Sequence, residues 1–352
     1  MLLANKTMKY ELSNRTLGEW VEYWAEKTPD KEYIVYADRG LRFTWKQFDE
    51  RVNDLAKGML AIGIEKGTHV GLWATNVPDW LTFLYACARI GAVCVTVNTN
   101  YKQNELEYLC ENSDMHTLCI VNGEKDSDFV QMTYTMLPEL RTCQRGHLKS
   151  ERFPRMKNVV YIGQEKFRGM YNTPELLLLG KNIANDRLLE AKSQVSCHDV
   201  VNMQYTSGTT GFPKGVMLTE HNLVSAVYYG LQVADIKTRC LSVLPYHHTY
   251  ESVVGILVAI HKRATICIND SLKNVLKNLQ LFKPDYIYLV PAFTEVFYKK
   301  IWSNAEESGK AKILKIMIPV SNGLRKVGID LRNVLFKSKC GSIFISTKPI
   351  PL

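Results

Sequence analysis

The sequence TSGTTGFPKG, from Thr206 to Gly215, is the stretch from which the rest of the chain is interpreted. It follows an apolar run, Val200 to Tyr205, and precedes a second one, Val216 to Leu218, and both runs have the length of a strand. A loop between two strands can be held rigidly at both ends. The glycines of this loop allow backbone conformations with positive φ, in which consecutive N–H groups can point at one anion. Its hydroxyl side chains and the ammonium group of Lys214 add further donors. The pattern predicts a phosphate-binding loop, and a glycine-rich surface turn with a solvated lysine is the alternative.

The spacing of the glycines excludes the P-loop of the common NTPases. That loop has four residues between its glycines and ends in Gly-Lys-Ser or Gly-Lys-Thr. Here two residues separate Gly208 from Gly211, and Lys214 is followed by Gly215. The whole string instead resembles the signature loop of the adenylate-forming superfamily, which includes acyl-CoA synthetases, luciferases and the adenylation domains of peptide synthetases.

Composition sets the outer limits of the interpretation. The chain has 352 residues, of which 46% are hydrophobic and 22% charged, enough for two lobes and a sizeable core. The net charge is +9, but the 44 lysines and arginines are scattered, so we expect a basic surface without nucleic-acid binding. The nine cysteines form no C-x-x-C and have no histidines at metal-ligand spacing, which predicts reduced thiols, several of them in the core.

The reduced cysteines, together with the two sequence stretches described next, predict a cytoplasmic protein. The residues from Met1 to Thr7 are too few for a signal peptide, and the apolar run from Val253 to Ile260 is well short of the about 20 residues that a membrane span needs. Peripheral contact with a membrane surface stays open.

Strand and helix patterns alternate along the chain, which predicts an α/β fold with mostly parallel sheets flanked by helices. We expect two lobes, at 16–190 and 191–352, after an N-terminal lead at 1–15. The segment 123–180 has little periodicity, and its basic residues are interpreted as a solvated face. These residues are Arg141, Arg145, His147, Lys149 and Arg152.

In the first lobe the patterns predict helices at 17–28, 44–62, 79–90 and 104–112, and strands at 33–36, 41–43, 70–74, 93–97 and 116–121. In the second lobe they predict helices at 222–233, 272–282 and 293–302, and strands at 240–244, 264–268 and 286–290. Residues 305–339 are expected to form a helical excursion on the surface.

A second informative stretch is LPYHHTYE, from Leu244 to Glu251. A strand that ends in a proline and two histidines places imidazoles at the carboxyl edge of a sheet, where α/β proteins bind their ligands. Either histidine is equally compatible with a half-buried structural role. The resemblance favours His248, because the family has a histidine three residues after a proline, beside the reacting carboxylate and the α-phosphate. No aspartate follows before Asp270, which disfavours the amino acid substrates of peptide synthetases.

The resemblance implies specific roles for residues of both stretches. It implies catalytic roles for Lys214 and His248, and it assigns Mg²⁺ to Thr206. The residues that it assigns to nucleotide binding are Thr206, Ser207, Gly208, Thr209, Thr210, Gly211, Lys214 and Gly215. The residues that it assigns to the substrate pocket are Tyr246, His247, Tyr250, Glu251 and Pro291.

The chemistry that the resemblance implies has two steps. A carboxylate attacks the α-phosphorus of ATP to give an acyl adenylate and pyrophosphate, and the thiol of CoA then displaces AMP. The likeness is to synthetases for long-chain fatty acids, with a medium-chain or aryl acid as the alternative substrate.

The family's adenine-stacking Tyr-Gly-Thr-Glu stretch, its ribose-binding aspartate and its small C-terminal domain have no counterpart in these residues. We therefore expect a large N-terminal domain that is incomplete at its C-terminal end and has little activity alone. A nucleotide-binding module without ligase activity and a non-functional product are the alternatives from other classes.

Overall fold

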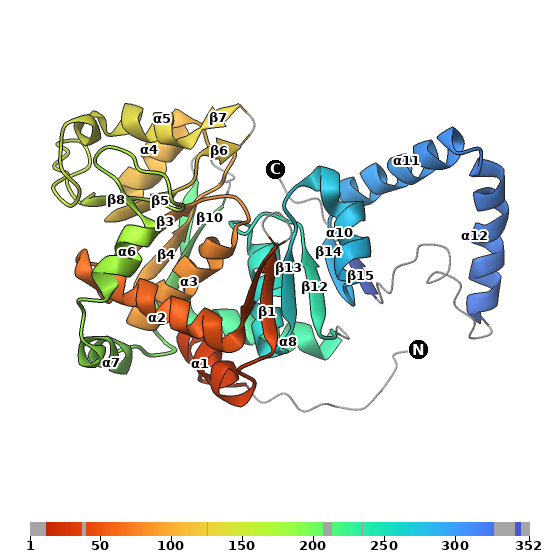
Figure 1. Ribbon diagram of the computed structural model, residues 1–352, viewed down its shortest axis with the longest axis horizontal. Coiled ribbons are helices and arrows are strands. Elements are labelled where there is room, and N and C mark those ends of the chain that lie inside the picture. The colour runs from red at the N-terminus through yellow and green to blue at the C-terminus, as the bar shows by residue number, and fades with distance from the viewer. Residues whose placement is uncertain are drawn as a thin grey trace.

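The computed structural model describes residues 12–36, 40–124, 126–206, 213–233, 236–326 and 342–345. Two large sheets with helices packed around them make up most of this structure (Figure 1). The helices α11 (Pro291–Glu307) and α12 (Ala311–Lys326) extend away from the second sheet (Figure 1). The arrangement confirms the predicted α/β class and the predicted helical excursion after residue 305, as far as residue 326.

The first sheet has seven strands in the order β11-β10-β4-β3-β5-β8-β9. Neighbouring strands are parallel except for β10 and β11, which are antiparallel. The strands β4, β5 and β8 are buried at every position, as expected where helices cover both faces of a parallel sheet. The strands are β3 (His69–Trp73), β4 (Val93–Thr96), β5 (Thr117–Ile120), β8 (Asn158–Tyr161), β9 (Tyr171–Asn172), β10 (Val200–Thr206) and β11 (Lys214–Thr219).

The second sheet has six strands in the order β15-β14-β12-β13-β1-β2. It is parallel except for the antiparallel pair β1 and β2, and a separate ribbon contains β6 and β7. The strands are β1 (Glu32–Tyr36), β2 (Leu41–Thr44), β12 (Arg239–Ser242), β13 (Thr265–Ile268), β14 (Tyr286–Leu289) and β15 (Ser342–Ile345), with β6 (Gly123–Glu124) and β7 (Ser127–Asp128) in the ribbon.

Each sheet contains strands from both sides of residue 190. The strands β1 and β2 come early in the chain but complete the second sheet, whereas β10 and β11 come late and complete the first. As a statement about folding units, the division into 16–190 and 191–352 stays a prediction. In the structure the chain passes between the two sheets more than once.

The helices follow the predicted patterns closely. Thr16 caps α1 through a reciprocal capping box with Glu19, as predicted, and Thr44 caps α2 in the same way with Gln47. The helices not yet given are α1 (Leu17–Lys27), α2 (Trp45–Ala61), α3 (Pro78–Ile90), α4 (Gln103–Asn112), α5 (Phe129–Met136), α6 (Thr173–Gly180), α7 (Asn185–Ser193), α8 (Glu220–Val233), α9 (Val258–His261) and α10 (Val275–Phe282). Shorter turns are the 3₁₀ segments η1 (Pro138–Arg141) and η3 (Leu272–Asn274) and the π-helix η2 (Glu251–Leu257).

The segment 123–180 is more ordered than its weak periodicity suggests, because it contains α5, β8, β9 and α6. The helix α6 packs closely on α2, and two glycines permit this approach. A side chain at Gly58 would overlap the Leu176 carbonyl, and one at Gly180 would lie 2.5 Å from the Asp54 carbonyl oxygen. Contacts between backbones, which hydrophobic periodicity does not report, hold this segment in place.

A continuous hydrophobic core includes residues of both sheets, and a smaller cluster lies between the second sheet and α10. Aromatic rings stack inside the core, with 3.8 Å between the ring centroids of Trp73 and Phe129. Among the eight described cysteines, only Cys143 and Cys197 are partly exposed, which agrees with the prediction of core thiols. Within the described residues, no helix has the length and apolar character needed to cross a bilayer.

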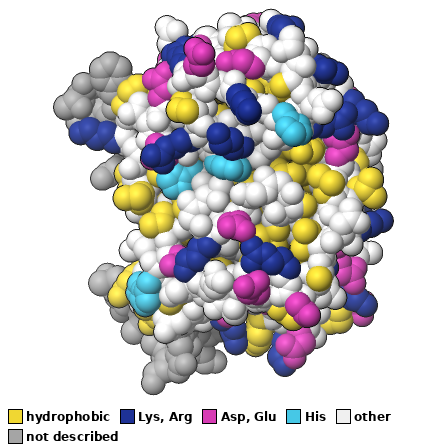
Figure 2. Space-filling view, turned by 90° about the vertical axis from the view of Figure 1, so that its left-hand side faces the viewer, with side chains coloured by type: hydrophobic (Ala, Val, Ile, Leu, Met, Phe, Trp, Pro, Cys, Tyr) yellow, Lys and Arg dark blue, Asp and Glu magenta, His cyan; other side chains and the backbone are white. Residues whose placement is uncertain are grey.

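The basic residues of the surface are dispersed. Figure 2 shows one face of the molecule, on which lysines and arginines lie among acidic side chains. Within the predicted solvated segment, Arg145 pairs with Glu175, and Arg152 pairs with Glu107 and Glu111. Such paired, exposed charges contribute little to stability and form no continuous basic surface.

Candidate active site

The two strands that flank the glycine loop form an antiparallel hairpin, in which Thr206 at the end of β10 pairs with Lys214 at the start of β11. The predicted strand–loop–strand arrangement is therefore present. Ser207, Gly208, Thr209, Thr210 and Gly211 lie outside the described residues, so their role in nucleotide binding stays a prediction.

The two described ends of this loop carry exposed polar side chains. The Lys214 side chain is exposed and has no acceptor among the described residues, and the Thr206 hydroxyl is exposed beside it. Gly215 leaves room for an aromatic ring, because a side chain there would lie 3.0 Å from Cζ of Tyr205. An ammonium group and a hydroxyl at a hairpin mouth are chemically suited to the oxygens of a polyphosphate.

The histidine turn follows β12 at the carboxyl edge of the second sheet. The His248 N–H donates to the Pro245 carbonyl at 3.1 Å, which closes the turn. The Tyr250 N–H donates to Nδ1 of His248 at 3.1 Å, so Nδ1 is an acceptor and Nε2 carries the proton of the neutral ring. Burial lowers the pKa of His248, which keeps the ring neutral at pH 7. His248 can therefore donate one hydrogen bond from Nε2 to a substrate oxygen.

Two side chains that the sequence did not single out hold this turn. Asn76, in the loop after β3, donates to the Leu244 carbonyl at 2.7 Å and accepts from the Tyr246 N–H at 3.0 Å. Gln204, near the end of β10, donates to the His247 carbonyl at 2.6 Å. Because Gln204 lies two residues before Thr206, the histidine turn is tied directly to the strand that leads into the glycine loop.

Gln204 is itself fixed by its neighbour in the sheet. Its amide oxygen accepts from the Thr96 hydroxyl at 3.0 Å, and both side chains are buried. A buried amide with both ends bonded has one defined orientation. No short motif signals such residues, because their partners are backbone groups far away in the sequence.

Three of the residues predicted for the substrate pocket are buried, namely Tyr246, His247 and Glu251. Tyr246 is fully buried, with its ring centroid 5.2 Å from that of Trp80. His247 is nearly buried, and burial together with the neighbouring His248 lowers its pKa to about 4. A neutral, buried His247 beside a catalytic candidate fits a supporting role, and direct contact of either residue with a substrate stays a prediction.

Glu251 is a buried acid at the start of the π-helix η2. Its carboxyl group accepts a hydrogen bond from the Ser242 hydroxyl, and burial raises its pKa to about 8. A side chain at Gly255 would lie 2.5 Å from Oε1 of Glu251, so the carboxyl group rests against the π-helix backbone. π-helices are uncommon and occur frequently at functional sites.

Tyr250 and Pro291 lie near the same sheet edge. The ring centroid of Tyr250 lies 5.9 Å from that of Tyr288 on β14, and Pro291 begins α11 just after that strand. The strands β12 and β14 are parallel neighbours, so the segments that follow them leave the sheet at one edge. The structure thus brings His248, Tyr250, Glu251 and Pro291 to one edge and joins that edge to β10.

The described residues contain no group of three or more histidine, cysteine, aspartate or glutamate side chains arranged to hold a metal ion. The Thr206 hydroxyl alone supplies one neutral oxygen, whereas Mg²⁺ needs near-octahedral oxygen coordination. Mg²⁺ binding at Thr206 therefore requires further oxygens, such as those of nucleotide phosphates, and stays a prediction.

Comparison with known proteins places this geometry in context. The family model for AMP-binding enzymes matches residues 21–335. YngI of Bacillus subtilis (strain 168), whose name gives it provisionally as an acyl-CoA synthetase, is 40% identical over 253 residues, covering 71% of this chain and 46% of YngI. The mitochondrial medium-chain acyl-CoA ligase ACSF2 of Bos taurus is 30% identical over 308 residues, covering 84% of this chain and 50% of the ligase.

A solved structure supports the fold. The long-chain-fatty-acid-CoA ligase FadD1 from Archaeoglobus fulgidus superposes with a TM-score of 0.65 at 24% identity, covering 86% of this chain and 57% of that protein. This chain spans about half the length of the curated relatives that it matches. Because the family model matches well over half of the chain, including both predicted motifs, the chain belongs to the family of AMP-binding enzymes.

Proposed function

We propose that the protein uses ATP to convert a carboxylic acid to an acyl adenylate and then to a CoA thioester, as an AMP-forming acid–thiol ligase. The observation that carries the proposal is the Gln204 contact, because it couples the strand leading to the glycine loop with the turn that bears His248. Carboxylate and triphosphate are both anionic, so the main task of such a site is to neutralise and position them.

The two catalytic candidates have complementary roles in this proposal. Lys214 supplies a mobile positive charge at the hairpin mouth, and Thr206 adds a hydroxyl for the phosphate oxygens or for a Mg²⁺ ion that they bind. His248 donates from Nε2 to the substrate carboxylate and orients it, because Nδ1 is already occupied by the Tyr250 N–H. ATP, Mg²⁺ and CoA are the implied partners.

The substrate in this proposal is a fatty acid. The names of the relatives include both medium-chain and long-chain ligases, which supports a fatty acid of either class over an amino acid. An aryl acid remains the alternative. A cytoplasmic location, with peripheral membrane contact, stays a prediction from the sequence.

A second candidate function is nucleotide binding without ligation. It is favoured by the exposed Thr206 and Lys214 at the hairpin mouth, which suit a polyphosphate whether or not an acid is activated. The two candidates differ in one measurable step, the release of pyrophosphate.

The test is ATP–pyrophosphate exchange with a panel of medium-chain, long-chain and aryl acids. Exchange that disappears in Lys214→Ala but persists in Lys181→Ala, an exposed lysine at the end of α6, supports the ligase. ATP binding without exchange supports the nucleotide-binding module. The absence of both exchange and ATP binding overturns the proposal for this chain.

A further inference from the structure

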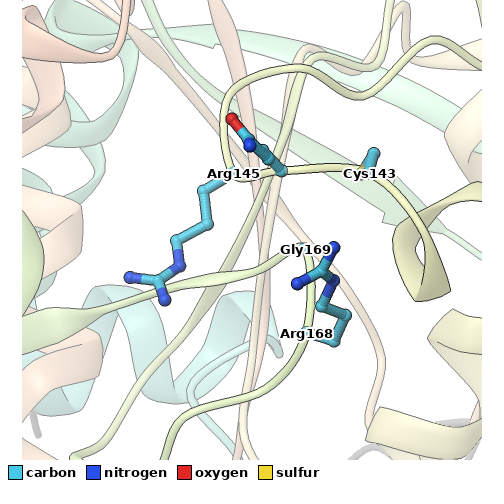
Figure 3. A pocket seen from close by; sticks show the side chains of 5 residues that line it. Cys143, Arg145, Arg168 and Gly169 are labelled. Atoms are coloured by element: carbon cyan, nitrogen blue, oxygen red, sulfur yellow. The ribbon is translucent and has the colours of Figure 1, made fainter.

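A cavity of about 310 Å³ lies on the surface beside β9 and is lined by Cys143, Gln144, Arg145, Arg168 and Gly169. The strand β9 is at one edge of the first sheet, and β11, which bears Lys214, is at the other. The cavity is therefore separated from the candidate active site by the width of the sheet. Figure 3 shows Cys143 and Arg145 on one segment and Arg168 with Gly169 on another.

Two glycines let these segments approach each other. Gly146 and Gly169 both have a φ of 74°, a left-handed conformation that other residues rarely adopt. A side chain at Gly169 would overlap the Leu140 carbonyl, and one at Gly146 would lie 2.6 Å from the Tyr171 hydroxyl. The cavity walls are thus built by backbone geometry that tolerates little change.

The cavity is rich in hydrogen-bond donors. Arg145 bonds through Nη1 to Glu175, and Arg168 bonds through Nη2 to the Thr142 carbonyl at 3.1 Å. A guanidinium group has five N–H donors, and the other donors of these two groups have no acceptor among the described residues. In Figure 3 the Arg168 guanidinium reaches toward the segment of Cys143. Two guanidinium groups with unused donors at one cavity suit a ligand with several acceptor oxygens.

The charges around the cavity also favour an anion. Arg141 lies 4.6 Å from the ring centroid of Tyr134, whose hydroxyl donates to the Arg168 carbonyl at 2.9 Å, so a third guanidinium is nearby. The opposing carboxylates are Glu175, which bonds Arg145, and Glu139, which lies near Cys143. Burial raises the pKa of the Cys143 thiol, so this side chain is neutral at pH 7 and does not repel an anion.

We propose that this cavity binds a small oxyanion of the phosphate class, held by Arg145 and Arg168 and separate from the adenylation site. Inorganic phosphate and the phosphate group of an ester share this chemistry. The proposal does not depend on ligase activity.

The chain contains its own reporter and control for a binding experiment. Cys143 lines the cavity and Cys197 does not, and both are partly exposed while the other described cysteines are buried. Alkylation of each thiol by iodoacetamide is followed by peptide mass spectrometry, with phosphate, with glycerol 3-phosphate, or with chloride at equal ionic strength. We expect phosphate to slow the alkylation of Cys143 severalfold and saturably, with Cys197 unchanged.

The two phosphate compounds distinguish the sources of the ligand. Equal protection by both means that the phosphate group alone is recognised, whereas protection only by the ester means that the ligand is a phosphate ester. Protection by neither, or equal protection of Cys143 and Cys197, overturns the proposal.

Two variants that change affinity in opposite directions separate binding from structural damage. Arg168→Gln should weaken phosphate binding roughly tenfold, as expected for the loss of one charge-assisted contact. Glu175→Gln should strengthen it, because it removes a competing charge and a glutamine preserves the α6 capping box. Arg152→Gln, a variant of an exposed, salt-bridged arginine that does not line the cavity, should have no effect.

If both Arg168→Gln and Glu175→Gln shift the affinity in the same direction, or if neither shifts it, the proposed contacts are wrong. Thermal melting of each variant verifies that it is folded. If Arg168→Gln does not fold, Glu175→Gln alone decides, because only an anion site gains affinity from the loss of that carboxylate.

Discussion

The role of Asn76 in holding the histidine turn leads to a quantitative prediction. In Asn76→Ala the Leu244 carbonyl and the Tyr246 N–H lose their partner, and both residues are buried, at 3% and 0% exposure. Each neutral hydrogen bond contributes about 1 kcal/mol net, and a buried group left without a partner raises the loss to about 1–3 kcal/mol. We expect Asn76→Ala to lower the free energy of unfolding by about 3 kcal/mol.

The assay is urea denaturation followed by tryptophan fluorescence, with two matched variants. Asn112→Ala removes one exposed side-chain bond to the Tyr108 carbonyl and should change the free energy of unfolding by less than about 0.5 kcal/mol. Asn76→Asp keeps an acceptor for the Tyr246 N–H but loses the donor to Leu244, so its loss should be intermediate. The NMR resonances of the His248 ring should also shift in Asn76→Ala and stay unchanged in Asn112→Ala.

The reasoning fails if Asn76→Ala and Asn112→Ala destabilise the protein equally. It also fails if Asn76→Ala leaves the His248 resonances unchanged, because the turn would then be held without Asn76. Destabilisation with unchanged resonances would make Asn76 a structural residue with no influence on the candidate active site.

Two further predictions concern buried groups. The Glu251 pKa of about 8 means that the folded protein keeps a proton that an unfolded carboxyl releases near pH 4.3, so the free energy of unfolding should fall between about pH 5 and 8. Glu251→Gln removes this titrating proton, so the free energy of unfolding should fall less steeply with pH, by up to about 1.4 kcal/mol per pH unit. If denaturation at a series of pH values gives the same slope for Glu251→Gln as for the unchanged protein, the raised pKa of Glu251 is wrong. Gly58→Ala should destabilise by about 3 kcal/mol in urea denaturation because the Leu176 backbone leaves no room, whereas Gly230→Ala, with nothing within 4 Å, should stabilise by about 0.5–1 kcal/mol. If both alanine variants change the free energy of unfolding in the same direction, the packing argument is wrong.

The exchange of strands between the two sheets has a consequence for the candidate site. Because β10 belongs to the first sheet and β12 to the second, Gln204 and the histidine turn meet where the carboxyl ends of strands from both sheets face each other. The coupling of β10 to the histidine turn therefore depends on how the two sheets pack. A continuous core that includes both sheets supports this packing.

The sequence by itself determined the local elements and the family. The reciprocal capping at Thr16, the strands around the glycine loop and the proline at the end of a strand are set by neighbouring residues, so their patterns can be interpreted without a structure. The glycine loop and the histidine stretch also identified the adenylate-forming fold, because their residue types and spacing are specific.

Only the tertiary structure decided which side chains support the candidate site. Asn76 and Gln204 act on backbone groups more than 40 residues away in the chain, at separations of 168 residues for Asn76 and Leu244 and 43 residues for Gln204 and His247. The burial of Tyr246 and the raised pKa of Glu251 likewise depend on neighbours brought from other helices and strands. Local patterns report the periodicity of burial along one element, but they do not report which distant backbone group an amide will bond or how deeply a charge will be buried. These are set by how segments distant in the chain pack, and so is the cavity where the segments of Arg145 and Arg168 meet.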